Sequence, residues 1–175
     1  MGKPGVCYTE ASRVEAEDKV LELRNPMSDS TQDTLKHIWR VQTLMQQAIA
    51  TLGWRMQEHD KSKLEEPEKS GYDQITTRLK DVSYGSPEYR ACLKELKPTV
   101  EHHYAHNSHH PEHYPNGVDG MSLLDLIEML ADWKAAGERH SDSSLEKSIA
   151  INEERFKLSP QLVAVLRNTQ KELNW

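Results

Sequence analysis

The sequence of 175 residues contains only two cysteines, Cys7 and Cys92, and no C-x-x-C motif. Two distant cysteines provide neither a framework of disulfide bonds nor a zinc site built from thiolates. The sequence also lacks an apolar run of about 20 residues, the length that a transmembrane helix needs, and it begins without the apolar core of a signal peptide. We therefore expect a cytoplasmic protein that does not insert into a membrane.

An excess of basic residues is missing as well. The 22 Lys and Arg residues are outnumbered by 28 Asp and Glu residues, which gives a formal net charge of −6. This charge opposes binding to a phosphate backbone, so duplex nucleic acid is not an expected partner. Aromatic residues are few, with Phe156 as the only phenylalanine, and apolar residues recur at helical rather than alternating spacing. The composition predicts an all-α protein.

No long linker rich in Gly, Ser or Pro interrupts the chain, and its length suits one globular domain. We expect a compact bundle of about six to eight helices over residues 28–175, preceded by a polar helix or extension over residues 1–27. Caps and apolar spacing predict helices at 9–23, from 28–30 to Gly53, at 54–64, from Pro67 onward, at 87–107 with an interruption or kink at Pro98, at 123–136, at 144–157 and at 160–173.

Histidine is concentrated in one stretch. Six of the nine histidines fall within twelve residues, at positions 102, 103, 106, 109, 110 and 113. On a helix, His102 and His106 share a face, as do His106 and His110, so that two or three imidazoles can point toward one ion. A solvated polar surface is the plainer interpretation, and it is the one we adopt for His113. The sequence leaves open which of the other five bind metal.

The dipeptide His59-Asp60 lies between this cluster and a helix that carries His37. Together with Asp132, these residues provide imidazole and carboxylate ligands from three separate segments, a set that suits Zn, Mn, Fe or Co. Asp125 is an alternative to Asp132, but its position three residues after Ser122 is better explained by a capping pair.

Three motifs in this order resemble the HD-domain metal-dependent phosphohydrolase superfamily: His37-x-x-Arg40-Val41, then His59-Asp60-Lys61-Ser62-Lys63, then His109-His110 followed by Leu130-Ala131-Asp132. The resemblance covers roughly residues 30–136, and the chain also resembles a small, phage-associated, HD-like family without assigned function. It implies an HD-like helical fold in which His37, His59, Asp60 and Asp132 hold a first metal ion. Asp60 would bridge to a second ion, with His109 and His110, and His106 as a further candidate, as its ligands.

The resemblance implies hydrolysis of a small phosphorylated substrate, most plausibly a nucleotide or deoxynucleotide, by metal-activated water. Asp60 and Lys63 are the expected catalytic residues, and Lys63, Arg40 and Glu112 the expected substrate contacts. The host would be a bacterium or a phage-infected cell. Two alternatives stay open: a di-iron HD-like oxygenase, and a non-enzymatic interaction module stabilised by metal. Association into a homo-oligomer is also left open.

Overall fold

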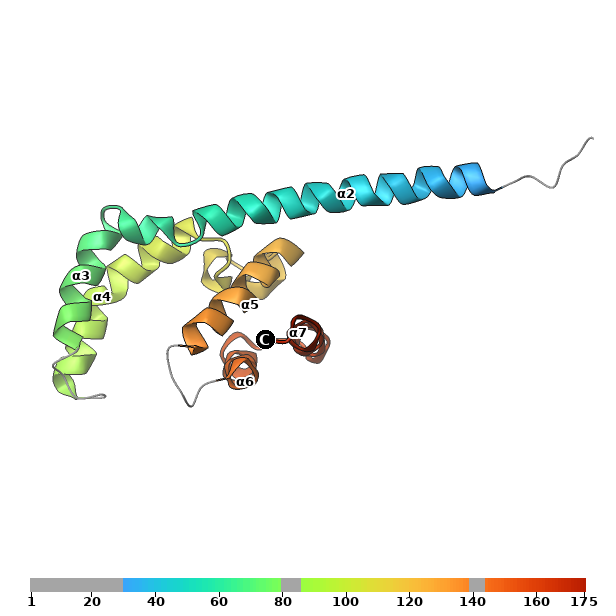
Figure 1. Cartoon of the computed structure of the whole chain (residues 1–175). Helices are drawn as coiled ribbons and strands as arrows, with labels where there is room; N and C mark the ends of the chain where they lie inside the picture. The colour runs from blue at the N-terminus through green and yellow to red at the C-terminus, as the bar shows by residue number, and fades with distance from the viewer. Residues whose placement is uncertain (1–29, 80–85, 139–143) are drawn as a thin grey trace, which may run out of the picture. The chain divides into compact units, whose positions relative to one another are not determined.

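The structure is a computed structural model that describes residues 30–79, 86–138 and 144–175, and these residues form helices and no strand. This confirms the predicted all-α class. The predicted helix at 9–23 lies outside the described residues. The α-helices are α2 (Thr31–Glu58), α3 (Glu68–Leu79), α4 (Pro87–His106), α5 (Leu123–Gly137), α6 (Leu145–Phe156) and α7 (Pro160–Leu173), and the 3-10 helices are η1 (Lys61–Leu64), η2 (Pro111–His113) and η3 (Gly117–Gly120) (Figure 1).

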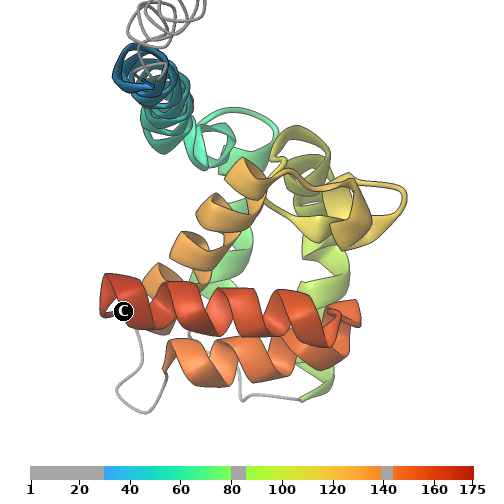
Figure 2. The ribbon, with the colours of Figure 1, turned by 90° about the vertical axis from the view of Figure 1, so that its right-hand side faces the viewer.

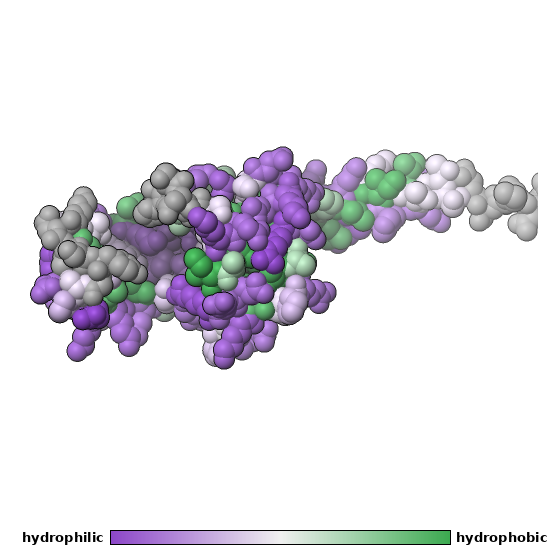
Figure 3. Space-filling model, turned by 90° about the horizontal axis from the view of Figure 1, so that it is seen from below, coloured by the Kyte–Doolittle hydropathy of each residue, from purple (hydrophilic) through white to green (hydrophobic). Residues whose placement is uncertain are grey.

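Contacts divide the chain into two units, Met1–Gln47 and Ala48–Trp175, and the division falls inside α2. In the first unit, the described part of α2 exposes many apolar side chains, which appear as green patches along this helix in Figure 3. They include Leu35, Ile38, Trp39, Val41, Leu44 and Met45. The boundary predicted between residues 27 and 28 falls outside the described residues and stays a prediction.

Serine caps begin four of the helices. The side-chain oxygens of Ser86, Ser122, Ser144 and Ser159 each accept a hydrogen bond from the backbone N–H three residues later. Such a cap satisfies one of the unpaired N–H groups of the first turn, and it stabilises a helix by about 1 kcal/mol. The predicted pair of Ser122 and Asp125 forms a complete capping box, because the Asp125 carboxylate also accepts from the Ser122 backbone N–H.

Two helices continue past residues that were predicted to end or interrupt them. Gly53 does not end its helix, because α2 continues to Glu58, so the separate helix predicted at 54–64 is the end of α2 followed by η1. Pro98 does not interrupt α4, which runs as one helix from Pro87 to His106. Glycine and proline destabilise a helix interior by about 1 and 3 kcal/mol, respectively. Tertiary contacts offset these costs: Arg55 forms ion pairs after Gly53, and α4 packs along α3.

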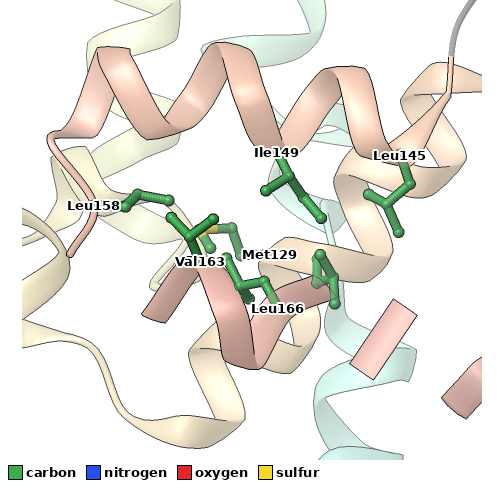
Figure 4. Close-up of a cluster of buried hydrophobic side chains, with 7 residues drawn as sticks. Met129, Leu145, Ile149, Leu158, Val163 and Leu166 are labelled. Atoms are coloured by element: carbon green, nitrogen blue, oxygen red, sulfur yellow. The ribbon is translucent and has the colours of Figure 1, made fainter. Parts of the chain in front are cut away.

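A hydrophobic core joins α5, α6 and α7. Its buried side chains interdigitate as Figure 4 shows, and Figure 2 shows α6 and α7 lying side by side. Burial of a large apolar side chain of this kind stabilises a fold by roughly 1.5–3 kcal/mol. The core therefore fixes α5, whose other face carries carboxylates. The core residues are Met129, Leu130, Leu145, Ile149, Leu158, Val163 and Leu166.

The lengths and apolar contents of the described helices bear on membrane insertion. None of them is long and apolar enough to cross a membrane.

Candidate metal centre

Asp60 occupies the turn between α2 and η1. Its backbone is left-handed, with φ 58° and ψ 11°, a conformation that Asp and Asn tolerate better than most residues. The backbone N–H of Lys63 donates to the Asp60 carbonyl oxygen over 2.9 Å, and the Lys63 Nζ lies 2.6 Å from Asp60 Oδ2. This turn holds a carboxylate that is only 22% exposed in a defined orientation.

Three imidazoles surround the other carboxylate oxygen, Asp60 Oδ1. The Nε2 atoms of His103 and His109 lie 3.3 and 3.6 Å from it, and His103 Nε2 lies 2.9 Å from His110 Nε2. His103 comes from the last turn of α4, and the two other histidines follow that helix. These four residues form one group whose candidate ligand atoms all lie within 4.8 Å of one another.

A second group faces Asp60 Oδ2. The Nε2 atom of His59 lies 3.6 Å from this oxygen and 3.8 Å from Asp132 Oδ1 on α5. His59, Asp60 and Asp132 thus form another set of candidate ligands within 4.8 Å of one another. Because each oxygen of Asp60 faces a different group, this carboxylate is positioned to join two adjacent cation sites.

Two further carboxylates orient the imidazoles. Glu128 accepts from the Nδ1 atoms of His59 and His109 over 2.8 and 3.1 Å, and Glu68 accepts from His103 Nδ1 over 2.9 Å. An ionised carboxylate can only accept, so in each neutral imidazole the Nδ1 atom carries the proton and the Nε2 atom, which faces Asp60, keeps a lone pair. Carboxylates hold metal-binding histidines in this way in many metalloproteins.

His59, His109 and Glu128 also lie close enough together to form a third set of candidate ligands. In this set, however, the Glu128 oxygens already accept from the two Nδ1 atoms and from Arg55 Nε, over 2.7 Å. We therefore assign Glu128 a supporting role rather than a place among the ligands.

The spacing of the lone pairs fits a divalent ion. Ligand bonds of about 2.0–2.2 Å place neighbouring ligand atoms about 2.9–3.5 Å apart in octahedral or tetrahedral geometry. Two of the five distances in the two groups, 2.9 and 3.3 Å, fall within this range, and the other three, of 3.6, 3.6 and 3.8 Å, are slightly longer. Moreover, Asp60 Oδ1 and His109 Nε2 are buried and have no hydrogen-bond partner among the described residues. Buried, unpaired acceptors are costly unless a cation or water satisfies them.

The protonation states of Asp60 and His110 favour cation binding. Burial opposes ionisation of Asp60, but its contacts with His103 and Lys63 keep its pKa well below the ordinary value. Burial, together with the nearby His109 and His103, lowers the pKa of His110 to about 3, so its imidazole is neutral at pH 7. The hydrogen bond to Glu128 raises the pKa of His59, and the Asp60 and Asp132 charges act in the same direction.

Arg55 links this centre to the body of the protein. Its guanidinium donates to Glu128 Oε2 over 2.7 Å, to Asp125 Oδ1 over 2.6 Å and to Ser108 Oγ over 3.1 Å. Asp125 also accepts from Ser122, Ser108 and Tyr114. Both Asp125 oxygens thus already accept hydrogen bonds. Asp132 is the carboxylate of α5 that belongs to a ligand group, and the sequence had also favoured Asp132 over Asp125.

The structure does not bring His37 to this centre. His37 lies exposed in the first unit and belongs to none of the ligand groups. It stands 22 positions before His59, and α2 is unbroken between Thr31 and Glu58. Arg40 is likewise exposed in the first unit.

His106 and Glu112 also lie outside the ligand groups. His106 is exposed, stacks on His102 at 4.0 Å between ring centroids, and directs Nδ1 at the His102 carbonyl oxygen. Glu112 pairs with Arg155 over 2.6 Å. The shared helical face of His106 and His110 that the sequence suggested does not exist, because α4 ends at His106 and His110 follows in a turn. His103 takes the expected place of His106.

Glu68, Glu128 and Arg55 were not predicted from the sequence. A signal for Glu128 exists in retrospect, because Asp125, Glu128 and Asp132 are three and seven positions apart and so share one face of α5. Glu68 gives no comparable signal. It is fully buried in the first turn of α3, and only the packing of α3 against α4 places it beside His102 and His103.

A family model described as "Family of unknown function (DUF5662)" matches residues 27–172, which include every residue of both ligand groups. The chain belongs to this family. No curated protein and no solved structure matches the chain. Because the family description names no activity, the resemblance to HD-domain phosphohydrolases stays an expectation.

We expect Asp125 to make the metal-free protein sensitive to acid. Burial raises its pKa, but the hydrogen bonds from Ser122, Ser108 and Tyr114 lower it to about 2, below its ordinary value of 3.8. A carboxyl group with a depressed folded-state pKa stabilises the fold fully above its unfolded-state pKa, and this stabilisation is lost as the pH falls. The denaturant midpoint of the metal-free protein should therefore fall between about pH 5 and pH 2.

Asp125→Asn should make this fall shallower, while Asp33→Asn, on an exposed residue paired with Lys36, should leave it unchanged. Urea titrations at several pH values measure the difference. An equally steep fall in the Asp125 variant would show that other carboxylates, such as Glu128, account for the acid sensitivity.

Proposed function

We propose that the protein is a metal-dependent phosphohydrolase that acts on a small phosphorylated substrate. The observation that carries the proposal is the carboxylate of Asp60, whose two oxygens face two separate groups of candidate ligands. His103, His109 and His110 would hold one ion, and His59 and Asp132 the other. A divalent ion in such a site makes a water molecule acidic enough to act as nucleophile near neutral pH and withdraws charge from a phosphoryl oxygen.

The protein's own residues supply the remaining functions. Lys63 carries a compact positive charge beside Asp60 and lies 5.9 Å from the centroid of the Tyr72 ring. Its side chain is 38% exposed, so it can reach a phosphate oxygen that approaches from solvent. We assign Lys63 to binding the phosphoryl group and stabilising its charge in the transition state. Glu68 and Glu128 are positioning residues that act through the imidazoles.

A lysine substitution should separate substrate chemistry from metal binding. Lys63→Ala should keep the metal, because the ligand atoms stay in place, and should lower kcat by about 10²–10³, the typical effect of one such electrostatic contact. Metal content by mass spectrometry and kcat with a phosphomonoester are the two measurements.

Lys61→Ala is the matched control, because Lys61 is exposed and pairs with Glu58 rather than with Asp60. If both lysine variants kept full activity, Lys63 would only face solvent. If Lys63→Ala lost its metal, the lysine would be structural.

The proposal as a whole is tested by measuring bound metals in the purified protein and then assaying the metal-free protein reloaded with Mn, Co, Zn or Fe. The substrates assayed are phosphomonoesters, nucleotides and deoxynucleotides. The nucleotides and deoxynucleotides are included because the resemblance to HD-domain phosphohydrolases implies them. Hydrolysis that requires added metal supports the proposal. Metal that raises the melting temperature, with no turnover on any ester, would overturn it in favour of an interaction module stabilised by metal.

The ligand set also favours a second candidate, an iron-dependent oxygenase. A bridging carboxylate with several imidazoles suits iron as well as manganese or zinc. Oxygen consumption that depends on iron, without phosphate release, would identify this activity. Phosphate release with zinc or manganese under anaerobic conditions would exclude it.

A further inference from the structure

An open cavity of about 570 Å³ adjoins the candidate metal centre within the second unit. Its size lies in the range of small-molecule sites. Side chains from the last part of α2 and from α5 line it, and most of them are apolar. The lining residues without a charged group are Ile49, Leu52, Gly53, Met56, Ala131 and Ala135.

The few polar groups in the lining are already engaged, with one exception. Arg55 donates to Glu128, Asp125 and Ser108, and Glu128 accepts from Arg55 and two imidazoles. The exception is the pair of His59 Nε2 and Asp132 Oδ1, which face each other over 3.8 Å and belong to one of the ligand groups. The cavity therefore joins an apolar space directly to two candidate metal ligands.

The cavity has exposed apolar side chains that a ligand would cover. Ile49 is 64% exposed and Met56 is 73% exposed, although each is large enough to stabilise the protein substantially if covered. A ligand that covers them and also reaches the metal centre must have an apolar part and a charged end.

We propose that this cavity binds the hydrocarbon or aryl part of the substrate, so that the protein acts on amphiphilic phosphate monoesters with a compact apolar group. The proposal rests on the proposed function, and it names the substrate class of the same site. The phosphate lies at His59 and Asp132, and the apolar group lies between α2 and α5.

This lining disfavours a nucleotide. A nucleobase presents several donors and acceptors along its edges, and leaving them unpaired on burial costs a few kcal/mol. Arg55 and Glu128 could pair with such an edge only by giving up their present partners. A hydrocarbon group needs no such partners, and its affinity grows with the apolar area it buries.

Binding of n-alkylphosphonates with one to ten carbons tests the proposal, because their carbon–phosphorus bond is not an ester. Calorimetry with the metal-loaded protein should give a Kd that falls about three- to fourfold per added methylene until the cavity is filled. The heat-capacity change of binding should become more negative along the series. Nucleoside monophosphates should bind no more tightly than methylphosphonate.

Ala135→Trp should remove the dependence of Kd on the chain length of the alkylphosphonate, while leaving the Kd of methylphosphonate unchanged. Residue 135 is exposed, so the larger side chain can be accommodated without disturbing the core. Ala136→Trp is the matched control, because Ala136 is also exposed, adjoins residue 135 and does not line the cavity. Ala135→Asp provides a second variant, since a charge at the cavity should weaken only the longer ligands.

The outcomes distinguish this proposal from the proposed function. If phosphate esters are hydrolysed but Kd does not change with chain length, the substrate class is wrong and the proposed function stands. The same conclusion follows if esters are hydrolysed and both tryptophan variants lose the dependence of Kd on chain length equally. If no ester is hydrolysed although Kd falls with chain length, the function is wrong and the cavity is a binding site for an apolar anion. If Ala135→Trp instead changes a dimer into a monomer in sedimentation, a second copy of the chain covers the cavity and the proposal is overturned.

Discussion

Replacing Asp60 with asparagine should remove the bound metal and abolish turnover together. Each Asp60 oxygen faces one group of candidate ligands, so no other single side chain contributes to both ligand groups through two oxygens. An amide nitrogen is a poor ligand for a divalent ion, and the loss of the negative charge weakens both sites. Asparagine is the appropriate substitute because, like aspartate, it tolerates the left-handed backbone at this position.

Metal analysis after dialysis should find about two ions per chain in the unmodified protein and close to none in Asp60→Asn. His110→Ala should lose only one, because His110 belongs to one group. His113→Ala is the control, since His113 belongs to neither group and directs its Nδ1 at the Tyr104 carbonyl oxygen. Two ions retained by Asp60→Asn would refute the bridging role, and an unchanged count in His110→Ala would remove His110 from the centre.

Replacing Arg55 with alanine should cost about 3–5 kcal/mol of unfolding free energy, the range found when one member of a buried ion pair is removed. The guanidinium is 16% exposed, and it faces Asp125 and Glu128, which are 4% and 14% exposed. Without Arg55, two carboxylates would stay partly buried with no cation beside them, and burial of an unpaired charge is costly. Denaturant titration of the metal-free protein measures the loss.

Arg155→Ala is the matched control. Arg155 pairs with Glu112 over 2.6 Å, but its side chain is 54% exposed, and a pair of this kind contributes about 0–1 kcal/mol. The loss of unfolding free energy in Arg55→Lys should lie between the losses in Arg55→Ala and Arg155→Ala, because an ammonium group keeps the charge without the planar geometry that reaches three acceptors. A loss in Arg55→Ala no greater than that in Arg155→Ala would show that solvent screens the network.

The Arg55 network also couples stability to the site. Glu128 accepts from Arg55 and from the Nδ1 atoms of His59 and His109. Contacts with the two histidines and the charge of Arg55 keep the pKa of Glu128 below its ordinary value, although burial opposes this. Removing Arg55 should therefore loosen the imidazoles that Glu128 orients, and the metal affinity of Arg55→Ala should fall even at temperatures where the variant is folded.

Several local features of the fold were predictable from the sequence because neighbouring residues determine them. The starts of the helices at Ser86-Pro87, Ser122 and Ser159-Pro160 follow from a side-chain oxygen that caps the first turn, with proline at the first helical position in two of the cases. Apolar spacing similarly identified an all-α chain. By contrast, the local signals of Gly53 and Pro98 were misleading, because contacts between helices outweighed them.

The candidate site was predictable only in part. The sequence pointed to His59, Asp60, His109, His110 and Asp132, which the structure brings together, and their role as ligands stays a prediction. It also pointed to His37 and His106, which lie elsewhere. A motif gives the order of residues along the chain, but the distance between two side chains depends on where each helix ends. His37 belongs to none of the ligand groups, and His103 on α4, rather than His106 at its end, faces Asp60.

The sequence by itself determined the helical class, the helix caps, the acidic net charge and the residue types capable of binding a divalent ion. The tertiary structure decided which of those residues meet, that Glu68 and Glu128 orient them, and that an apolar cavity adjoins them. The physical reason is the range of the interactions. Capping and helical spacing act within a few residues. The ligand groups, by contrast, need side chains from the turn after α2, from the end of α4 and the segment after it, and from α5, and the cavity needs side chains from both α2 and α5.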